Sequence, residues 1–213
     1  MYLDDLLRSN FEATKDWCYT GVGVLEFDVK MRDYLADNHY SYPVVTRFAG
    51  ANTSEDQMKV QVQDVTSLRD MLLSFEDPLA TVALLANADV RVVSLTITEF
   101  GYRVPLNADD FKLVELALSG HLMDFGDGSD AAFTTGSSTG STFPQLAHPA
   151  PSSDVVGPAY RNATVFGLLM ASLAVRFTLG RRPYTVMSCD NLPHNGEVAK
   201  KRLLVGRCRL TPG

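Results

Sequence analysis

The chain has 213 residues, 46% of them hydrophobic and 21% charged, which suits one large domain with a buried core. Its formal net charge of -6 argues against a nucleic-acid-binding protein, because such a protein needs a basic surface. The three cysteines have neither paired nor CxxC spacing, so we expect no disulfide framework and no metal site. Because neither a signal peptide nor a bilayer-length apolar run is visible, we expect a cytoplasmic protein without a membrane partner.

The first 75 residues predict a mixture of helices and strands. Apolar residues recur at helical spacing in the amino-terminal segment MYLDDLL. The elements expected after it are a strand at Trp17–Val24, a helix at Val29–Asp37, strands at Tyr42–Phe48 and Met58–Val65, and a helix from Ser67 through Phe75. Ser67 is the expected cap of that last helix, because Asp70 follows it three residues later.

The rest of the chain alternates helices with two strands. The expected helices are Asp77–Ala86, Asp109–Leu118, Arg161–Leu179 and one that starts at Gly196 and is broken at Gly206; the expected strands are Val90–Thr98 and Tyr184–Cys189. The unbroken β-branched run of Val90–Thr98 predicts a parallel strand covered on both faces. Residues at about 120–158 are rich in Ser, Gly, Thr and Pro and predict a flexible insertion. Strands alternating with helices indicate an α/β fold with a mostly parallel sheet.

Polar residues collect where three of the predicted strands end. They follow Gly21 and Gly23, they include Thr96, Thr98 and Glu99, and they run from Ser188 to Asn191. Ligands of parallel sheets bind outside the carboxyl ends of the strands. The pattern therefore predicts a cofactor crevice at one edge of the sheet.

The first cluster, GVGVLEFD, has two glycines and two acids but lacks the third glycine of a GxGxxG fingerprint. Close strand packing accounts for Gly21 and Gly23 as well as cofactor binding does. Asp28 has two open interpretations, a partner for the ribose hydroxyls of adenosine or a helix cap. Glu26 is the weaker ribose candidate.

The second cluster ends the strongest predicted strand. Thr96 and Thr98 are expected on the same face of that strand, with Glu99 opening the turn. Their hydroxyl and backbone groups suit the nicotinamide end of a cofactor. Threonine is also simply a good strand residue, and both interpretations stay open.

The third cluster carries two side-chain amides, Asn191 and Asn195, around Pro193. An amide that donates to a substrate carbonyl oxygen stabilises the charge that develops there. Asparagine and Asn-Gly pairs also close turns, so substrate binding and turn formation remain equal alternatives. His194 is expected as an exposed turn residue, and Cys189 as a small buried residue.

Three segments, WCYTGVGV, RVVSLTITEFGY and TVMSCDNLPHNG, together resemble the mannitol dehydrogenase family of long-chain polyol and hexuronate dehydrogenases. Members of that family share a strand ending in Gly-Val-Gly, a Ser-Leu-Thr-Ile-Thr-Glu-x-Gly-Tyr segment and a Ser-Cys-Asp-Asn-x-x-x-Asn-Gly segment, in the same order. MYLDDLL, DVKMRDYLADNHYSYPVV and the segment 171–176 also match.

The resemblance implies an amino-terminal Rossmann domain that binds NAD and a helical domain whose lysine is the general acid/base of hydride transfer. It implies that Asn191 polarises the substrate oxygen and that Asp28 meets the adenosine ribose. Thr98 and Glu99 would lie beside the nicotinamide.

Two departures from the family pattern stand out. The Gly-x-Gly-x-Phe-His-Arg-Ala-His segment and first strand, which precede MYLDDLL in the family, are absent here, as is the Lys-x-x-x-x-Asn-x-x-His element of the helical domain. We therefore expect an incomplete NAD-binding Rossmann-type domain at 1–205, a tail at 206–213 and no helical catalytic domain. Without the first strand, which is normally central, Trp17–Val24 and Val90–Thr98 must pair directly if one sheet is to survive.

The expected function is that of a truncated relative of an NAD-dependent polyol dehydrogenase of the mannitol or fructuronate type. Alone, such a chain should bind NAD weakly or not at all and should not oxidise a polyol to a ketose. One alternative is a part of a split enzyme, completed by another chain or by a homo-oligomer. The other is a non-catalytic binding or interaction module that has kept the sheet.

Overall fold

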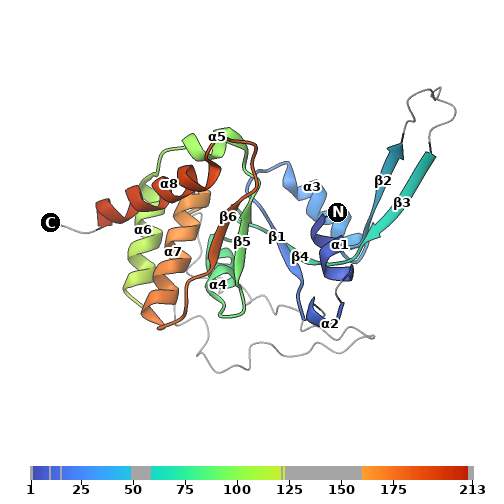
Figure 1. Cartoon of the computed structure of the whole chain (residues 1–213). Coiled ribbons are helices and arrows are strands. Elements are labelled where there is room, and N and C mark those ends of the chain that lie inside the picture. The colour runs from blue at the N-terminus through green and yellow to red at the C-terminus, as the bar shows by residue number, and fades with distance from the viewer. Residues whose placement is uncertain are drawn as a thin grey trace. The chain divides into compact units, whose positions relative to one another are not determined.

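A computed structural model of the protein describes residues 2–9, 11–14, 16–48, 59–120, 122 and 160–210 (Figure 1). Apart from residues 120 and 122, the insertion expected at about 120–158 lies outside these described residues. The chain divides into two compact units, with a boundary between Leu72 and Leu73. The described residues before that boundary form the amino-terminal unit, and those after it form the carboxy-terminal unit.

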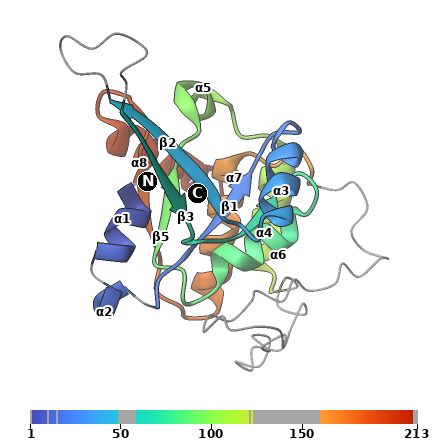
Figure 2. The same ribbon diagram turned by 90° about the vertical axis from the view of Figure 1, so that its right-hand side faces the viewer.

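The amino-terminal unit contains short helices and two pairs of strands. Its elements are α1 (Tyr2–Ser9), α2 (Phe11–Thr14), β1 (Tyr19–Gly23), α3 (Asp28–Asp37), β2 (Tyr42–Phe48), β3 (Lys59–Val65) and β4 (Leu68–Leu73). Strands β2 and β3 are antiparallel, with Tyr42 opposite Val65 and Phe48 opposite Lys59, and they form a two-stranded ribbon (Figure 2). These elements confirm the predicted helices α1 and α3 and the predicted strands β1, β2 and β3.

The helix predicted from Ser67 through Phe75 is wrong, because Leu68–Leu73 is strand β4, hydrogen-bonded to β1. Leu68 and Asp70 are buried on either side of the exposed Arg69, which is a strand periodicity of two. Ser67 caps no helix. Its hydroxyl donates to Asp4 at 2.7 Å, and its carbonyl accepts the Tyr19 N–H at 3.1 Å.

The carboxy-terminal unit surrounds a parallel pair of strands with helices. Its elements are α4 (Pro78–Ala86), β5 (Val92–Leu95), α5 (Thr98–Arg103), α6 (Ala108–Leu118), α7 (Val165–Thr178), β6 (Thr185–Ser188) and α8 (Asn195–Leu210). Strands β5 and β6 run parallel, with Val92 opposite Thr185 and Leu95 opposite Ser188. Parallel strands flanked by helices confirm the predicted α/β fold.

The main hydrophobic core of the described residues lies in the carboxy-terminal unit. Its most buried large side chains are Phe166 and Leu169 of α7, Leu113 and Val114 of α6 and Val82 of α4. Helix α7 is buried nearly all round, as expected of a helix that is apolar on every face. This core fixes the positions of the ends of β5 and β6.

Helices α6 and α7 meet at a buried carboxylate. Asp110 is fully buried, and it accepts hydrogen bonds from the backbone N–H groups of Asn107 (2.8 Å) and Thr164 (2.6 Å) and from the Thr164 hydroxyl (3.1 Å). Burial raises the pKa of Asp110, and these bonds oppose the rise. A Cβ at Gly167 would lie 1.9 Å from Oδ1 of Asp110, so a residue without a side chain is needed where the helices touch.

Three further expectations need correction. Strand β5 is shorter than predicted and only partly covered, since Val92 is exposed and α5 starts at Thr98. Each described strand has one partner, so β1 pairs with β4 and not with β5, and the expected single sheet is replaced by three two-stranded ones. Helix α8 continues across Gly206 to Leu210.

Among the helices of the described part, none combines the length and the hydropathy that a bilayer-spanning segment needs.

Candidate functional site

The carboxyl ends of β5 and β6 are joined by one side chain, Asp190. Its Oδ2 accepts the N–H of Ile97 at 3.1 Å, and its Oδ1 accepts the N–H of Thr98 at 2.8 Å. Backbone bonds continue the junction, since the N–H of Cys189 donates to the carbonyl of Leu95 at 2.9 Å. Two segments that are about 90 residues apart in sequence are thus tied together where the strands end.

A chain of hydroxyl groups extends this junction. Tyr102 of α5 donates from its hydroxyl to Oδ2 of Asp190 at 2.8 Å and lies 2.6 Å from Oγ of Ser188. A phenol has one proton, so Ser188 is the donor in the second bond. Burial raises the pKa of Tyr102 to about 12, and the neighbouring Asp190 adds to the rise, so its hydroxyl remains a proton donor at neutral pH.

Thr98 occupies a backbone conformation that a β-branched residue rarely adopts. Its φ is 60°, in the left-handed region. Such strain costs about 1–3 kcal/mol and persists where surrounding contacts hold the residue. The expectation that Thr96 and Thr98 share one strand face is wrong, because β5 ends at Leu95 and Thr98 opens α5. Thr98 is exposed, as a group that contacts a ligand must be.

Glu99, the other residue predicted at the nicotinamide end, is paired within its own helix. Its Oε1 accepts from Nη2 of Arg103, one turn later, and both side chains are exposed. An exposed pair four residues apart contributes a few tenths of a kcal/mol. The Glu99 carboxylate can therefore leave this contact at little cost.

The two predicted amides have different surroundings. Nδ2 of Asn195 donates to the carbonyls of Ser188 (3.2 Å) and Asp190 (3.1 Å), and its Oδ1 accepts the N–H of Gly196 at 2.7 Å. Asn195 therefore closes the turn between β6 and α8. Asn191 is exposed, and its side-chain amide makes no hydrogen bond to any described residue. Of the two, Asn191 has its donors available.

The structure places the three predicted residues of the amino-terminal unit around the end of β1. Gly21 packs against the neighbouring strand, since a Cβ there would lie 3.3 Å from Cγ of Met71, and Gly23 is buried. Oδ2 of Asp28 accepts the N–H groups of Val24 (2.9 Å) and Leu25 (3.0 Å). This carboxylate holds the turn that leads into α3.

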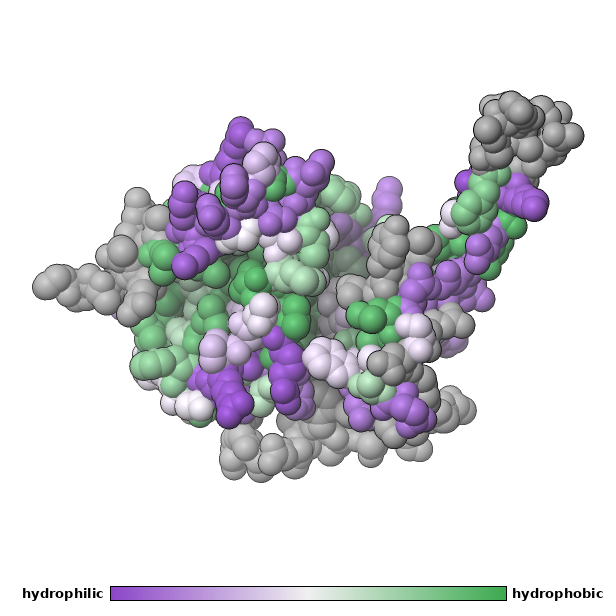
Figure 3. All heavy atoms as spheres, viewed as in Figure 1, coloured by the Kyte–Doolittle hydropathy of each residue, from purple (hydrophilic) through white to green (hydrophobic). Residues whose placement is uncertain are grey.

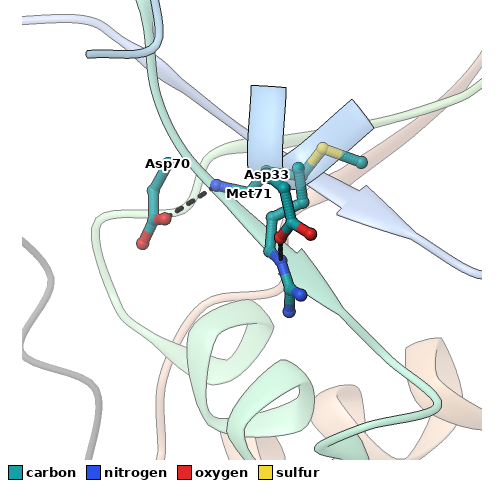
Figure 4. A network of polar contacts seen from close by, with 4 residues as sticks. Asp33, Asp70 and Met71 are labelled. Carbon is teal, nitrogen blue, oxygen red and sulfur yellow. Dashed lines mark hydrogen bonds and ion pairs between the residues drawn. The ribbon is translucent and has the colours of Figure 1, made fainter. Parts of the chain in front are cut away.

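A further polar network lies in the amino-terminal unit (Figure 4). Oδ1 of Asp70 accepts the N–H of Met71 at 2.7 Å, and Nε of Arg32 donates to Asp33 at 2.9 Å. Burial raises the pKa of Tyr40 to about 12, with a contribution from Asp70. The two bonds in Figure 4 join sequence neighbours and fix local conformation. Within the described residues no cluster of His, Cys, Asp and Glu has the arrangement of a metal site.

Sequence reasoning predicted Thr98 and Asn191 at the edge of β5 and β6, and the structure brings their segments together through Asp190. It placed Asp190 in the third polar cluster without a role, and it missed Tyr102. The available signal was position, because Asp190 directly follows a predicted strand and Tyr102 lies four residues after Thr98. Only the parallel pairing of β5 with β6 shows that the two residues meet.

Residues 2–210, nearly the whole chain, match the sequence profile of the mannitol dehydrogenase Rossmann domain. The chain belongs to the mannitol dehydrogenase family. The predicted resemblance is confirmed, and membership of this oxidoreductase family with a Rossmann fold is established for the matched residues.

Known relatives include two fungal mannitol 2-dehydrogenases. The protein of Pyricularia oryzae is 29% identical over 203 residues, and that of Emericella nidulans is 32% identical over 205 residues. In both cases the match covers 95% of this chain and 32% of the relative. The chain thus spans about a third of the length of these relatives.

Two solved structures of polyol dehydrogenases are also similar to this chain. The Pseudomonas fluorescens mannitol 2-dehydrogenase, solved as a ternary complex with NAD and D-mannitol, superposes with a TM-score of 0.61 at 29% identity, over 99% of this chain and 34% of that one. A D-sorbitol dehydrogenase in substrate-free form superposes with a TM-score of 0.61 at 28% identity, over 99% and 35% of the two chains.

Two residues predicted to contact NAD or substrate are accessible to a ligand where β5 and β6 end. Thr98 and Asn191 are exposed, and the Asn191 amide has free donors. Oδ2 of Asp28, the residue predicted at the adenosine ribose, already accepts two backbone N–H groups in the amino-terminal unit. The Pseudomonas fluorescens relative was solved with NAD.

Proposed function

We propose that this chain forms the NAD-binding part of a polyol dehydrogenase that transfers hydride between NAD(H) and a sugar alcohol or its ketose. The observation that carries the proposal is the junction at Asp190, which presents the free amide of Asn191 in a chain matched to the family from residue 2 to residue 210. The related mannitol 2-dehydrogenase solved with NAD and D-mannitol supports the choice of cofactor and substrate class.

In this proposal Asn191 donates to the substrate oxygen and stabilises the charge that develops on it. Thr98 and Glu99 contact the nicotinamide end of NAD, and Asp28 accepts from the adenosine ribose through its second oxygen. Gly21 and Gly23 keep the end of β1 close to its neighbouring strand. The amide of Asn195 donates to backbone carbonyls, so in this proposal Asn195 supports the turn and does not itself contact the substrate. NAD, when bound, accepts or returns the hydride.

The 213-residue chain has no Lys-x-x-x-x-Asn-x-x-His pattern, the element that carries the general acid/base lysine in the family. We therefore propose that these 213 residues alone do not oxidise a polyol. They also lack the family's Gly-x-Gly-x-Phe-His-Arg-Ala-His segment, so we propose that they bind NAD weakly. Turnover then requires the remaining, helical part of such an enzyme, in the same polypeptide or in another one.

A chimera tests this function. Residues 2–210 replace the matching third of the Emericella nidulans mannitol 2-dehydrogenase, and NAD-dependent oxidation of mannitol is measured by NADH absorbance. We expect turnover, and we expect Asn191→Ala to lower kcat by about 100- to 1,000-fold, the usual effect of losing one donor to a developing charge. Asn38→Ala, at an exposed asparagine that ends α3, is the matched control and should leave kcat within about twofold.

Three results would count against the proposal. A folded chimera without NADH binding favours a non-catalytic module. Equal kcat values for the wild-type and Asn191→Ala chimeras remove the role of Asn191. Saturable oxidation of mannitol by the purified 213-residue chain contradicts the requirement for a helical part.

A further inference from the structure

The side chain of Asp190 accepts hydrogen bonds from a distant part of the chain, directly beside the exposed Asn191. Its three donors, Ile97 N–H, Thr98 N–H and the Tyr102 hydroxyl, come from residues 88 to 93 positions earlier in the chain. They belong to the end of the β5 segment and to α5, while Asp190 follows β6. The hydroxyl of Tyr102 adds a second bond across this edge, to Oγ of Ser188.

We propose that Asp190 is a positioning residue, and that with Tyr102 and Ser188 it forms a latch that fixes the Asn191 amide and the Thr98 backbone at the end of β5 and β6. This inference rests on the proposed function, because it names what holds the groups of that site. Asn191 is the next residue after Asp190, so a fixed Asp190 restricts the backbone from which the free amide projects. The N–H of Thr98 donates to Oδ1 of the same carboxylate, and this bond helps to hold Thr98 in its left-handed conformation.

The bonds of Asp190 argue against a direct role as an acid or base. Oδ2 accepts from two donors and Oδ1 from one, so about three of the four acceptor positions of the carboxylate are already occupied. A general base must reach the substrate proton with a free lone pair. The carboxylate of Asp190 instead binds groups of the protein itself. Bonds from N–H and O–H groups to a carboxylate are stronger than bonds between neutral groups.

The latch needs a carboxylate and not merely a side chain of that size. An ionised carboxylate only accepts, with two oxygens, whereas an asparagine offers one accepting oxygen and an N–H₂ group. In Asp190→Asn at least one of the three donors must lose its acceptor. The raised pKa of Tyr102, to about 12, agrees with a phenol that keeps its proton and donates to the carboxylate.

The test uses the full 213-residue chain, labelled with ¹⁵N, and compares wild type with Asp190→Asn by NMR. We expect hydrogen exchange at the Ile97 and Thr98 amides to become about 10- to 100-fold faster, as the loss of a charge-assisted hydrogen bond implies. We also expect the order parameter of the Asn191 side-chain amide to fall. The matched control is Asp77→Asn, at the cap of α4, where Asp77 accepts from Ala80 and asparagine caps equally well. It should leave both measurements unchanged.

A faster exchange at Ile97 and Thr98 with an unchanged order parameter for Asn191 overturns the positioning role, because a purely structural carboxylate would behave in this way. Unchanged exchange overturns the latch altogether. If Asp190→Asn does not fold, Tyr102→Phe removes only the hydroxyl. A folded Tyr102→Phe chain whose Asn191 amide is as ordered as in wild type also overturns the proposal.

These measurements contain no NADH and no polyol, so they separate the two proposals. If the chimera lacks NAD-dependent turnover while Asp190→Asn loosens the Asn191 amide, the proposed function fails and the latch remains. If the chimera works and the amide of Asp190→Asn stays ordered, the function remains and the latch fails.

Discussion

The two units of the chain differ in how they use their apolar residues. In the carboxy-terminal unit, α4, α6 and α7 bury large side chains around β5 and β6, and all members of the main core cluster among the described residues lie there. In the amino-terminal unit, the β2–β3 ribbon exposes Val45, Val60 and Val62, and Figure 3 shows hydrophobic residues at the surface of this ribbon. The comparison indicates that stability and site geometry are concentrated in the carboxy-terminal unit.

Buried polar groups occur in both units, and the bonds of the most buried ones join distant parts of the chain. In the carboxy-terminal unit, the buried Asp110 accepts from the N–H of Thr164, 54 positions later, and the buried Tyr184 donates to the carbonyl of Leu169, 15 positions earlier. In the amino-terminal unit, the buried Asp4 accepts from the Ser67 hydroxyl, 63 positions later, whereas the bonds of the less buried Asp28 and Asp33 reach residues within four positions. Long-range polar contacts such as those of Asp110 and Asp190 hold elements together, whereas short-range ones shape single turns.

The largest expected effect is in the core. Phe166→Ala removes a ring that is 1% exposed and should lower the free energy of unfolding by about 3–5 kcal/mol. Phe177→Ala, on the same helix at a position 80% exposed, is the matched control and should change it by about 0.5 kcal/mol or less. Urea denaturation followed by circular dichroism measures both. Similar losses of unfolding free energy in the two variants would contradict the conclusion that the core of the carboxy-terminal unit carries the stability.

The next effect is at the contact between α6 and α7. Asp110→Ala leaves the N–H groups of Asn107 and Thr164 without their acceptor, and we expect a loss of about 2–4 kcal/mol. Asp109→Ala, its sequence neighbour with only a 3.5 Å contact to Asn162, should cost less than about 1 kcal/mol. Denaturant midpoints give the difference. An equal loss in both variants would show that Asp110 carries no special role.

An alkaline titration sharpens the comparison further. Burial raises the pKa of Tyr184 to about 12, whereas the unfolded value is about 10. The stabilisation is therefore complete below pH ~10 and is lost as the pH rises from ~10 through ~12, by up to about 2–3 kcal/mol. Tyr184→Phe should reduce this pH dependence and cost about 1 kcal/mol near pH 7, because the bond to the Leu169 carbonyl is lost. Unfolding curves with identical pH dependence for both chains would exclude this contribution.

The smallest expected effect is on the ribbon. Val62 of β3 is 60% exposed and lies opposite Val45 of β2. Val62→Thr should change the free energy of unfolding by about 0.5 kcal/mol or less. Threonine keeps the β-branched shape that strands favour. A loss above about 2 kcal/mol in the thermal or urea transition would mean that the ribbon face is buried in solution, and the contrast between the units would no longer hold.

Hydrophobic periodicity predicted many helices and strands, because it is a pattern within one short segment of the sequence. The pattern of Pro78–Ala86 and of Ala108–Leu118 gave helices with nearly the observed bounds. The error at Leu68–Leu73 arose because a serine with an acid three residues later resembles a helix cap, while the pairing with β1 that decides the matter is a long-range contact. Similarly, the β-branched run of Val90–Thr98 conceals the point at which the chain leaves the strand for α5.

The site was predictable as a set of residue types but not as an arrangement. The motifs identified Thr98 and Asn191, and residue type alone gave equal weight to Asn191 and Asn195. The structure distinguishes them, since the donors of Asn195 are bound to backbone carbonyls and those of Asn191 are free. The role of Asp190 and its contact with Tyr102 were not predicted, because the contact requires the parallel register of β5 and β6.

The most direct test of the central claim, that NAD meets this chain where β5 and β6 end, is a titration of the ¹⁵N-labelled 213-residue chain with NADH followed by NMR. The account predicts weak, saturable shifts at the backbone amide of Thr98 and the side-chain amide of Asn191, with a common dissociation constant. Shifts confined to residues away from both positions, or no shift of any resonance, would contradict it.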